Sequence, residues 1–510
     1  MSDFISILDR KAGSMTGVDA SADCVTDLHL DQIIDAVTEG HADSDFGRFF
    51  YAPFRDLSTV EYRQEVFDDL ENDQTRGSIL NFVDGMRAMR DRLQLAGNVW
   101  HPLQRQGWLI AAVETYCRTA ARLRDELFDL RLQSRGLRDF GEYVSRYVGS
   151  DAFTGLAAES ATVRDQLSTI RYLVHIEGLR VHVEKFNDHP DYSCKVGHTF
   201  ERFADEVASD YRIALADYND MNHVEEQILQ CVADMYPEPF RLLDDFCRRH
   251  EDFIEPTIAR FEHEIPFYLS YLAFMQRFTA TGLAFCRPQV TNDRGVMDVR
   301  DAFDLAFALN AVAEEKRPVT NNFSLSGAER ILVVTGPNQG GKTTFARTIG
   351  QCAYLASLGC PVPASSARLT LPDQIYTHFE RQEHVLTLHG KLDDELVRIH
   401  DILSRVSAAS IVIMNESFSS TTVSDALLIG SEVLRRIIEL GCVAVYVSFL
   451  DELSELDPAC VSMVGGVAHD DPTQRTFTFS RRPADGLAYA AALADKYGLS
   501  YEVLRHRISQ

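Results

Sequence analysis

The stretch ILVVTGPNQGGKTT, residues 331–344, constrains the fold of this chain more than any other part of the sequence. Its first four residues are apolar and mostly β-branched, which is typical of a buried strand. The turn that follows fits the pattern G-x-x-x-x-G-K-[ST] at every fixed position, with Gly336, Gly341, Lys342 and Thr343. A helix is expected to begin near Thr343. Strand, glycine-rich turn and helix in this order predict a loop that binds the phosphates of a nucleoside triphosphate.

The residue types in this loop suit that chemistry. Glycines let several backbone N–H groups point at one phosphate, and the N-terminus of the helix adds a positive dipole end. Lys342 is expected to reach the β- and γ-phosphates, and the Thr343 hydroxyl to coordinate Mg²⁺. A glycine-rich turn without a ligand is the alternative, and it is disfavoured because strand, turn and helix are all in place. The predicted nucleotide ligands are Gly336, Pro337, Asn338, Gln339, Gly340, Gly341, Lys342, Thr343 and Thr344.

Length and charge limit what the rest of the chain does. At 510 residues the chain is too long for one ordinary core, so two or three domains are expected. The formal net charge of −26 argues against non-specific binding of nucleic acid by the whole surface. A local basic groove stays open as a possibility.

The sequence predicts a cytoplasmic protein that does not enter a membrane. The N-terminus has no basic region followed by an apolar core, and the longest apolar stretch, residues 265–275, is too short to span a bilayer. The ten cysteines are scattered without a C-x-x-C pair, so neither disulfides nor a zinc site is expected.

Periodicity divides the chain into three parts. Residues 1–23 are small and polar and are interpreted as a loose lead-in. Residues 24–290 are mostly helical, with long helices expected over 77–165 and a capping box at Ser58 and Glu61. Alternating apolar residues around Glu177-Gly178 predict a β-hairpin over residues 172–184. A polar turn at residues 291–295 marks the boundary to an α/β part, 291–510.

Residues 118–138 contain many arginines, mixed with aspartate and glutamate. Two interpretations are open: a face that contacts DNA, or a solvated helix face with internal ion pairs. The second is favoured because acidic residues are interleaved throughout.

A second motif follows 68 residues after Thr343. Residues 411–414 are apolar and end in Asn415 and Glu416, the pattern of a buried strand that delivers polar groups beside Mg²⁺ and the attacking water. Glu416 is expected to orient or deprotonate that water, with Lys342 as the other catalytic residue. Asn415 stands where a carboxylate is usual, so it brings an oxygen to the metal but no charge. With residues 443–447 as a third buried strand, a mostly parallel sheet is predicted.

At these residues the sequence resembles the MutS family of DNA mismatch-repair ATPases, whose loop reads T-G-P-N-M-G-G-K-S-T. Segments similar to the family's follow in order at 358–364, 415–425 and 488–504, with weaker similarity at 50–70 and 272–288. Residues 319–322 resemble the segment near the adenine, which makes Asn321 a further expected ligand of ATP.

The resemblance implies an α-helical core and lever domain with a small β-hairpin insertion over 24–290. An ABC-type, MutS-like α/β P-loop ATPase domain follows over 291–510. It also implies ATP and Mg²⁺ as ligands, and a homodimer whose levers act on DNA. Because the core begins almost at once, the chain is expected to be a short member without the N-terminal mismatch-recognition domain.

Three departures from the family pattern bear on turnover. Gly390 replaces the serine that is expected to touch the partner's γ-phosphate, and Lys391 is a candidate substitute for that serine. Phe449 replaces a histidine, and Asn415 replaces an aspartate. Slow ATP hydrolysis is therefore expected. Three functions stay open: a dimeric ATPase acting on a DNA structure, a nucleotide-gated scaffold for a protein partner, and a nucleotide-binding protein with negligible turnover.

Overall fold

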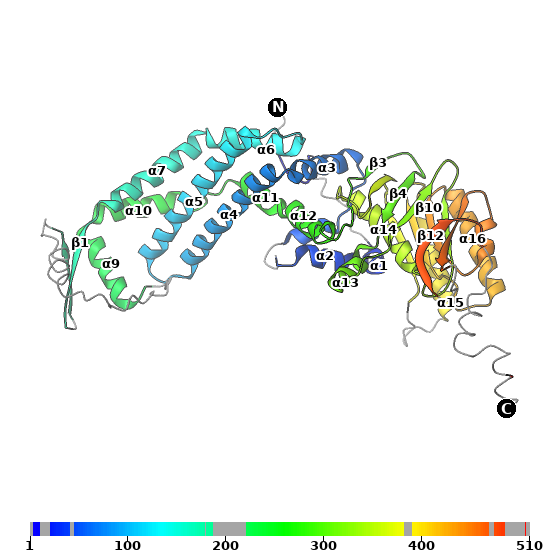
Figure 1. The fold of residues 1–510 in the computed structure, drawn as a ribbon. Coiled ribbons are helices and arrows are strands. Elements are labelled where there is room, and N and C mark those ends of the chain that lie inside the picture. The colour runs from blue at the N-terminus through cyan, green and yellow to red at the C-terminus, as the bar shows by residue number, and fades with distance from the viewer. Residues whose placement is uncertain are drawn as a thin grey trace, which may run out of the picture. The chain divides into compact units, whose positions relative to one another are not determined.

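The computed structural model describes residues 4–10, 21–40, 45–178, 180–186, 221–381, 390–468, 474–484 and 505. The chain forms two compact units (Figure 1). The first contains residues 1–73, 132–139 and 263–510, and the second contains residues 74–131 and 140–262. The boundary predicted at residues 291–295 falls inside the first unit.

The second unit is built mainly from long helices. The predicted helical block at residues 77–165 is confirmed. Within this unit α5 packs against α7 and α10, and Phe140 stacks on Phe261 with ring centroids 3.6 Å apart. Its helices, some of which extend past the unit boundaries, are α4 (Asp73–Asn98), α5 (Pro102–Asp129), α6 (Arg135–Val148), α7 (Asp151–Ser168), α9 (His223–Met235), α10 (Pro237–Arg249) and α11 (Pro256–Glu264).

The predicted β-hairpin is confirmed in the second unit. Strands β1 (Tyr172–Glu177) and β2 (Arg180–Lys185) pair antiparallel, with Val174 opposite Val183. Alternation of apolar residues along both strands gives this register, because residues two apart share one face of the hairpin.

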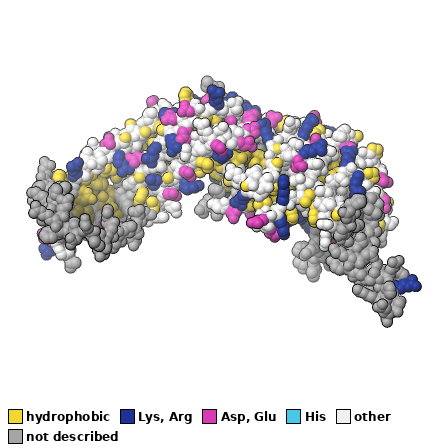
Figure 2. Space-filling model, viewed as in Figure 1, with side chains coloured by type: hydrophobic (Ala, Val, Ile, Leu, Met, Phe, Trp, Pro, Cys, Tyr) yellow, Lys and Arg dark blue, Asp and Glu magenta, His cyan; other side chains and the backbone are white. Residues whose placement is uncertain are grey.

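Ion pairs occupy part of the arginine-rich block of the second unit. Arg122 pairs with Glu126 at 2.6 Å, and Arg124 pairs with Asp125 at 2.7 Å. On the face shown in Figure 2, Lys and Arg side chains are interspersed with Asp and Glu. These contacts support the interpretation as a solvated, internally paired helix face.

The first unit contains a sheet whose described strands have the order β12-β11-β6-β10-β9-β8. Strands β8, β9, β10, β6 and β11 run parallel, and β12 pairs antiparallel with β11 at one edge. The predicted strands at 331–334, 411–414 and 443–447 are therefore confirmed. The strands are β6 (Ile331–Thr335), β8 (Ile375–Phe379), β9 (Ile411–Asn415), β10 (Val443–Val447), β11 (Cys460–Val467) and β12 (Arg475–Arg481).

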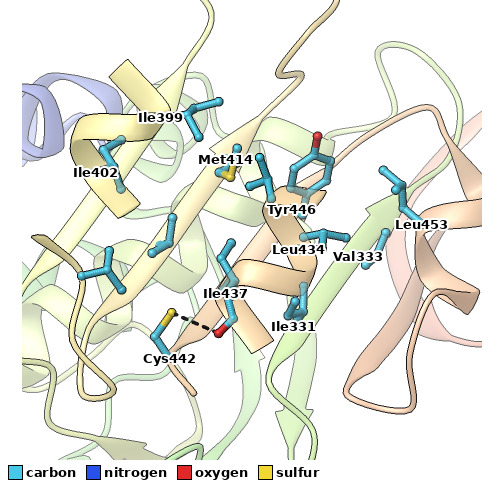
Figure 3. Packing of buried hydrophobic residues seen from close by; sticks show 14 of the residues in the cluster. Ile331, Val333, Ile399, Ile402, Met414, Leu434, Ile437, Cys442, Tyr446 and Leu453 are labelled. Carbon is cyan, nitrogen blue, oxygen red and sulfur yellow. Dashed lines mark hydrogen bonds between the residues drawn. The ribbon is translucent and has the colours of Figure 1, made fainter. Parts of the chain in front are cut away.

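Helices cover both faces of this sheet. On one face α15 (Lys391–Arg405) and α16 (Val423–Leu440) bury a core with Ile331, Val333, Met414 and Tyr446 (Figure 3). The other face receives α14 (Lys342–Ser357), whose Gly350 lies so close to Ile413 that an added Cβ would be 2.7 Å from it. Neighbouring residues of a strand thus pack against helices on opposite faces of the sheet, because successive side chains of a strand point to opposite faces.

A second sheet of the first unit has the order β3-β7-β4-β5. The helices of the first unit that have not yet been described lie in the same unit as this sheet. Among them, α12 packs against α2, α3 and η1. These elements are β3 (Gln289–Thr291), β4 (Met297–Ala302), β5 (Asn321–Leu325), β7 (Ser366–Thr370), α1 (Ala22–Asp27), α2 (Leu30–Thr38), η1 (Asp45–Phe50), α3 (Leu57–Glu71), α12 (Pro266–Thr279), α13 (Leu305–Ala313) and η3 (Asp451–Glu455).

Two predictions for the N-terminal region are wrong. The described part of the lead-in is packed, because Ile7 and Leu8 are fully buried and the backbone N–H of Ile7 donates to Glu264. Helix α3 begins at Leu57, before Ser58, so the predicted capping box does not form. The Ser58 hydroxyl instead donates to the carboxylate of Asp56, at 2.6 Å.

Among the described residues, no helix combines the length and the apolar character that crossing a membrane requires.

Candidate functional site

The first unit has a cavity of about 890 Å³ where β6 ends and α14 begins. Its walls come from α13, the segment before β5, the loop between β6 and α14, and strand β12. Glu416, directly after β9, also lines it. Because β6 and β9 are parallel and pair with the same strand, their carboxyl ends meet at one edge of the sheet, where open α/β sheets usually bind ligands.

The backbone between β6 and α14 has the tight path that the glycine spacing predicts. Gly336 has a φ of +132°, and a Cβ there would lie 3.0 Å from the backbone nitrogen of Gly465. Gly341 has a φ of +86° and caps α14, which begins at Lys342, one residue before the predicted start. Gln339 has a φ of +58°, uncommon for a residue with a Cβ. This loop therefore requires glycine at its two ends.

Lys342 is buried inside this loop. Its Nζ donates to the carbonyl oxygens of Gly336 at 3.1 Å and Pro337 at 3.4 Å. It also lies 4.2 Å from the centre of the Phe449 ring, a cation–π contact. Burial lowers the pKa of Lys342, and the nearby Glu416 carboxylate opposes that shift. The loop thus holds a lysine surrounded by oxygens and one aromatic face.

The two predicted metal ligands lie side by side. The Thr343 hydroxyl donates to Oδ1 of Asn415 at 3.0 Å. The contact follows from strand alternation, because Asn415 points to the same face of the sheet as Ile413, the face that α14 covers. A hydroxyl and an amide oxygen are donors of the kind that Mg²⁺ takes, together with phosphate oxygens and water.

The predicted catalytic residue Glu416 lies across from Lys342. Its Oε1 is 3.9 Å from Nζ of Lys342. Its backbone is in the left-handed region, with φ at +52°, and its N–H donates to the carbonyl of Val447 at 3.0 Å. The structure therefore brings Lys342, Thr343, Asn415 and Glu416 together, although 72 residues separate Thr343 from Asn415.

Asn321 lines the cavity, but its amide is used within the protein. Nδ2 donates to the carbonyl of Phe477 at 3.0 Å, and Oδ1 accepts from the N–H of Phe479 at 2.7 Å. These bonds hold the backbone of Phe477, whose φ is +58°. Asn321 thus ties β5 to β12, and Phe477 is the side chain that it sets at the cavity wall.

Aromatic residues at the cavity were missed by sequence reasoning. Phe307 and Phe477 line it and are 52% and 46% exposed, which is high for phenylalanine. Apolar residues in a helix and in a strand read as core residues from the sequence, so no pattern distinguished these two. The partly exposed Val319 lies on the same lining.

Gly390, Lys391 and Phe449, the residues that bear on turnover, have defined surroundings in the structure. Gly390 is the N-cap of α15, with a φ of −71° that any residue adopts. Nζ of Lys391 pairs with Glu380 of its own chain at 2.5 Å. Phe449 is half exposed and covers Lys342. The closing segment at residues 488–504 lies outside the described residues.

The fold and the loop define a class of protein: α/β domains in which a glycine-rich loop joins a parallel strand to a helix, with a second strand delivering a carboxylate beside it. A family model described as MutS domain V matches residues 332–503. Over these residues the chain is therefore similar to a domain of the MutS family.

Similar curated proteins carry mismatch-repair names. The chain is 25% identical over 274 residues to "Probable DNA mismatch repair protein Msh6" of Drosophila melanogaster, covering 51% of this chain and 22% of that protein. It is 30% identical over 171 residues to "DNA mismatch repair protein MSH3" of Yarrowia lipolytica, covering 33% and 16%. It is 26% identical over 182 residues to "DNA mismatch repair protein MutS" of Brevibacillus brevis, covering 35% and 21%. The chain thus spans about a fifth of the length of these relatives.

Proposed function

We propose that this chain binds ATP with Mg²⁺ in the 890 Å³ cavity and hydrolyses the ATP slowly. The observation that carries the proposal is the convergence of four groups from two distant strand ends. Thr343 and Asn415 are in contact at 3.0 Å, and Lys342 faces Glu416 at 3.9 Å. A cation, two neutral oxygen donors and a carboxylate are the parts that phosphoryl transfer to water needs.

Each of these residues has a definite role in the proposal. Backbone N–H groups of the loop and Nζ of Lys342 bind the phosphates, exchanging the carbonyl contacts of Lys342 for phosphate oxygens. Thr343 and Asn415 hold Mg²⁺, which neutralises developing charge on the phosphates when bound. Glu416 accepts a proton from the attacking water or orients it. The exposed faces of Phe307 and Phe477 offer an apolar wall for the base.

Slow turnover follows from the residues at three positions. Asn415 brings no negative charge to the metal, Gly390 presents no side chain, and Phe449 cannot transfer a proton or donate a hydrogen bond. Steady-state phosphate release with Lys342→Ala and Glu416→Gln as blanks tests the proposal. Wild-type release above both blanks supports it, and release equal to both would leave only nucleotide binding.

For the whole protein, the proposal is an ATP-dependent dimer that moves the long helices of the second unit on a DNA structure. The names of the relatives support DNA as the target. A filter-binding titration of branched against linear duplex, with and without ATP and at two salt concentrations, tests it. Equal and negligible binding of both duplexes would remove DNA from the proposal.

A nucleotide-gated scaffold for a protein partner is the second candidate. The net charge of −26 favours it, because such a surface repels the phosphate backbone of nucleic acids. The Glu416→Gln variant trapped with ATP serves as bait. A stoichiometric protein and no nucleic acid would select the scaffold over the DNA-directed ATPase.

A further inference from the structure

The turn that follows β9, residues 416–419, has a backbone conformation that its own residue types disfavour. Glu416 and Phe418 both have positive φ values, +52° and +64°. Neither is glycine, so the left-handed conformation is strained at both positions. Such a conformation persists only where surrounding structure fixes it, and strained residues of this kind are concentrated at functional sites.

Side chains from β8 and α15 fix this turn. Oε2 of Glu395 accepts the backbone N–H of Phe418 at 3.0 Å. Nδ1 of His378 lies 2.9 Å from the Ser417 hydroxyl. Glu380, just after β8, accepts from the Ser419 hydroxyl at 3.2 Å. Three consecutive residues after Glu416 are therefore each bonded to a side chain from a distant part of the chain.

The contact between Glu395 and Phe418 is buried, and the contact between His378 and Ser417 is partly buried. Glu395 is 5% exposed and His378 is 1% exposed. Loss of Glu395 leaves the buried backbone N–H of Phe418 unsatisfied, which is more costly than loss of a surface hydrogen bond. The Phe418 ring is buried in the core formed with α15 and α16, so its backbone cannot swing outward without exposing that ring.

The supporting elements are themselves joined. Lys391, the first residue of α15, pairs with Glu380 at 2.5 Å. Further along α15, Arg398 donates to the carbonyl of Phe379 at 3.3 Å. The turn is thus bonded to a joined frame of β8 and α15, whereas Glu416 itself points its carboxylate toward Lys342.

We propose that Glu395 and His378 are positioning residues, which hold Glu416 in its left-handed conformation facing the phosphate-binding loop. This inference rests on the proposed hydrolysis of ATP. Its consequence is that a displacement of α15 lowers the turnover number while leaving nucleotide affinity unchanged. Glu395 and His378 do not line the cavity, so the proposed function gives neither of them a contact with the nucleotide.

The test uses the full chain with MgATP as substrate and ATPγS for affinity. Glu395→Ala is expected to lower kcat about 10- to 100-fold, with the Kd for ATPγS within about 2-fold of wild type, because a shift of about 1 Å at a reacting group has that effect. Glu395→Gln keeps a carbonyl oxygen as acceptor and is expected to retain most of the wild-type kcat. His378→Gln is expected to lower kcat less than Glu395→Ala does.

Ile399→Val is the matched control, since Ile399 lies on α15 in the same core (Figure 3) and its hydrocarbon side chain makes no hydrogen bond to the turn. Loss of kcat in Ile399→Val to the same degree as in Glu395→Ala would reduce Glu395 to a stability residue and overturn the inference. So would an unchanged kcat in Glu395→Ala.

Amide hydrogen exchange of a peptide covering residues 416–419 gives a readout that does not need turnover. Faster exchange in Glu395→Ala, with wild-type exchange in Ile399→Val, supports the inference. Unchanged exchange in Glu395→Ala overturns it. Wild-type phosphate release no higher than that of Lys342→Ala would remove the proposed hydrolysis, and the exchange measurement still decides whether Glu395 holds the turn.

Discussion

The two segments that face each other across the cavity are built in different ways. The loop of residues 336–341 takes its shape mainly from near neighbours: Lys342 bonds to carbonyls five and six residues away, and Gly340 bonds to Pro337. One hydrogen bond comes from a distant residue, since Arg475 donates to the carbonyl of Asn338 at 3.3 Å. The turn of residues 416–419 takes its shape from side chains 23 to 39 residues away in the sequence. Local chemistry defines the first segment, and tertiary packing defines the second.

In the proposed function, this difference separates the segment that binds the nucleotide from the segment that acts in hydrolysis. A segment that carries its own geometry keeps it when the rest of the domain moves, so the loop suits nucleotide binding. A segment that depends on a neighbouring helix changes when that helix shifts, so the turn suits control of hydrolysis. Changes at each segment are therefore expected to have different kinetic signatures.

The largest expected effect is at Glu416. Glu416→Gln removes the carboxylate and is expected to lower kcat about 10³-fold, or about 4 kcal/mol in activation free energy, with ATP affinity near wild type. Lys342→Ala is expected to weaken ATP binding about 100-fold instead, through loss of charge-assisted hydrogen bonds to phosphate. Stopped-flow binding of a fluorescent ATP analogue and single-turnover hydrolysis measure the two quantities. A loss of affinity in Glu416→Gln equal to that in Lys342→Ala would erase the distinction between the segments.

The next effect concerns stability near the turn. Burial, followed by the charge of Arg398, lowers the pKa of His378 from its ordinary value of 6.5 to about 4. Between these values the unfolded chain binds a proton that the folded chain does not. The free energy of unfolding is thus expected to fall as the pH drops from about 6.5 to about 4, by about 3 kcal/mol in total.

Urea unfolding from pH 7 to pH 4, compared between wild type and His378→Gln, isolates this contribution. Glutamine does not titrate, so the difference between the two curves is expected to change over this window. Parallel curves for the two proteins would mean that the pKa of His378 is the same in the folded and the unfolded state.

The same difference explains what the sequence could predict. The loop, the second strand and the parallel sheet follow from motif spacing and apolar runs, and residues within a few positions of one another give all of them. The bonds from Glu395 and His378 to the turn depend on which helix covers which strand, so only the structure shows them. Asn321 shows the intermediate case, because resemblance placed it at the cavity while only the structure shows its bonds to β12.

Asn321 also provides a test at the far wall of the cavity. Asn321→Ala removes both bonds that hold Phe477 in its strained backbone conformation. ATP affinity is expected to fall about 10-fold, or about 1.4 kcal/mol, because the ring then leaves the cavity wall, while kcat at saturating ATP stays near wild type. The control compares the Phe477→Leu and Asn321→Ala variants with the double variant. If the losses of ATP affinity in the two single variants add fully in the double variant, Asn321 does not act through Phe477.

The smallest expected effect is at Phe449, which contacts the loop from the end of β10. Nζ of Lys342 contacts both the Phe449 ring and the loop carbonyls. The contact with the ring must weaken when Nζ moves to bind phosphate. Phe449→Leu keeps an apolar cover but removes the cation–π contact, so ATP affinity is expected to rise about 3-fold, corresponding to ~0.7 kcal/mol. Isothermal titration of both proteins with ATPγS measures the change. Weaker binding in Phe449→Leu would mean that the ring orients Lys342 for phosphate, so the loop too would depend on a distant residue and the contrast with the turn would narrow.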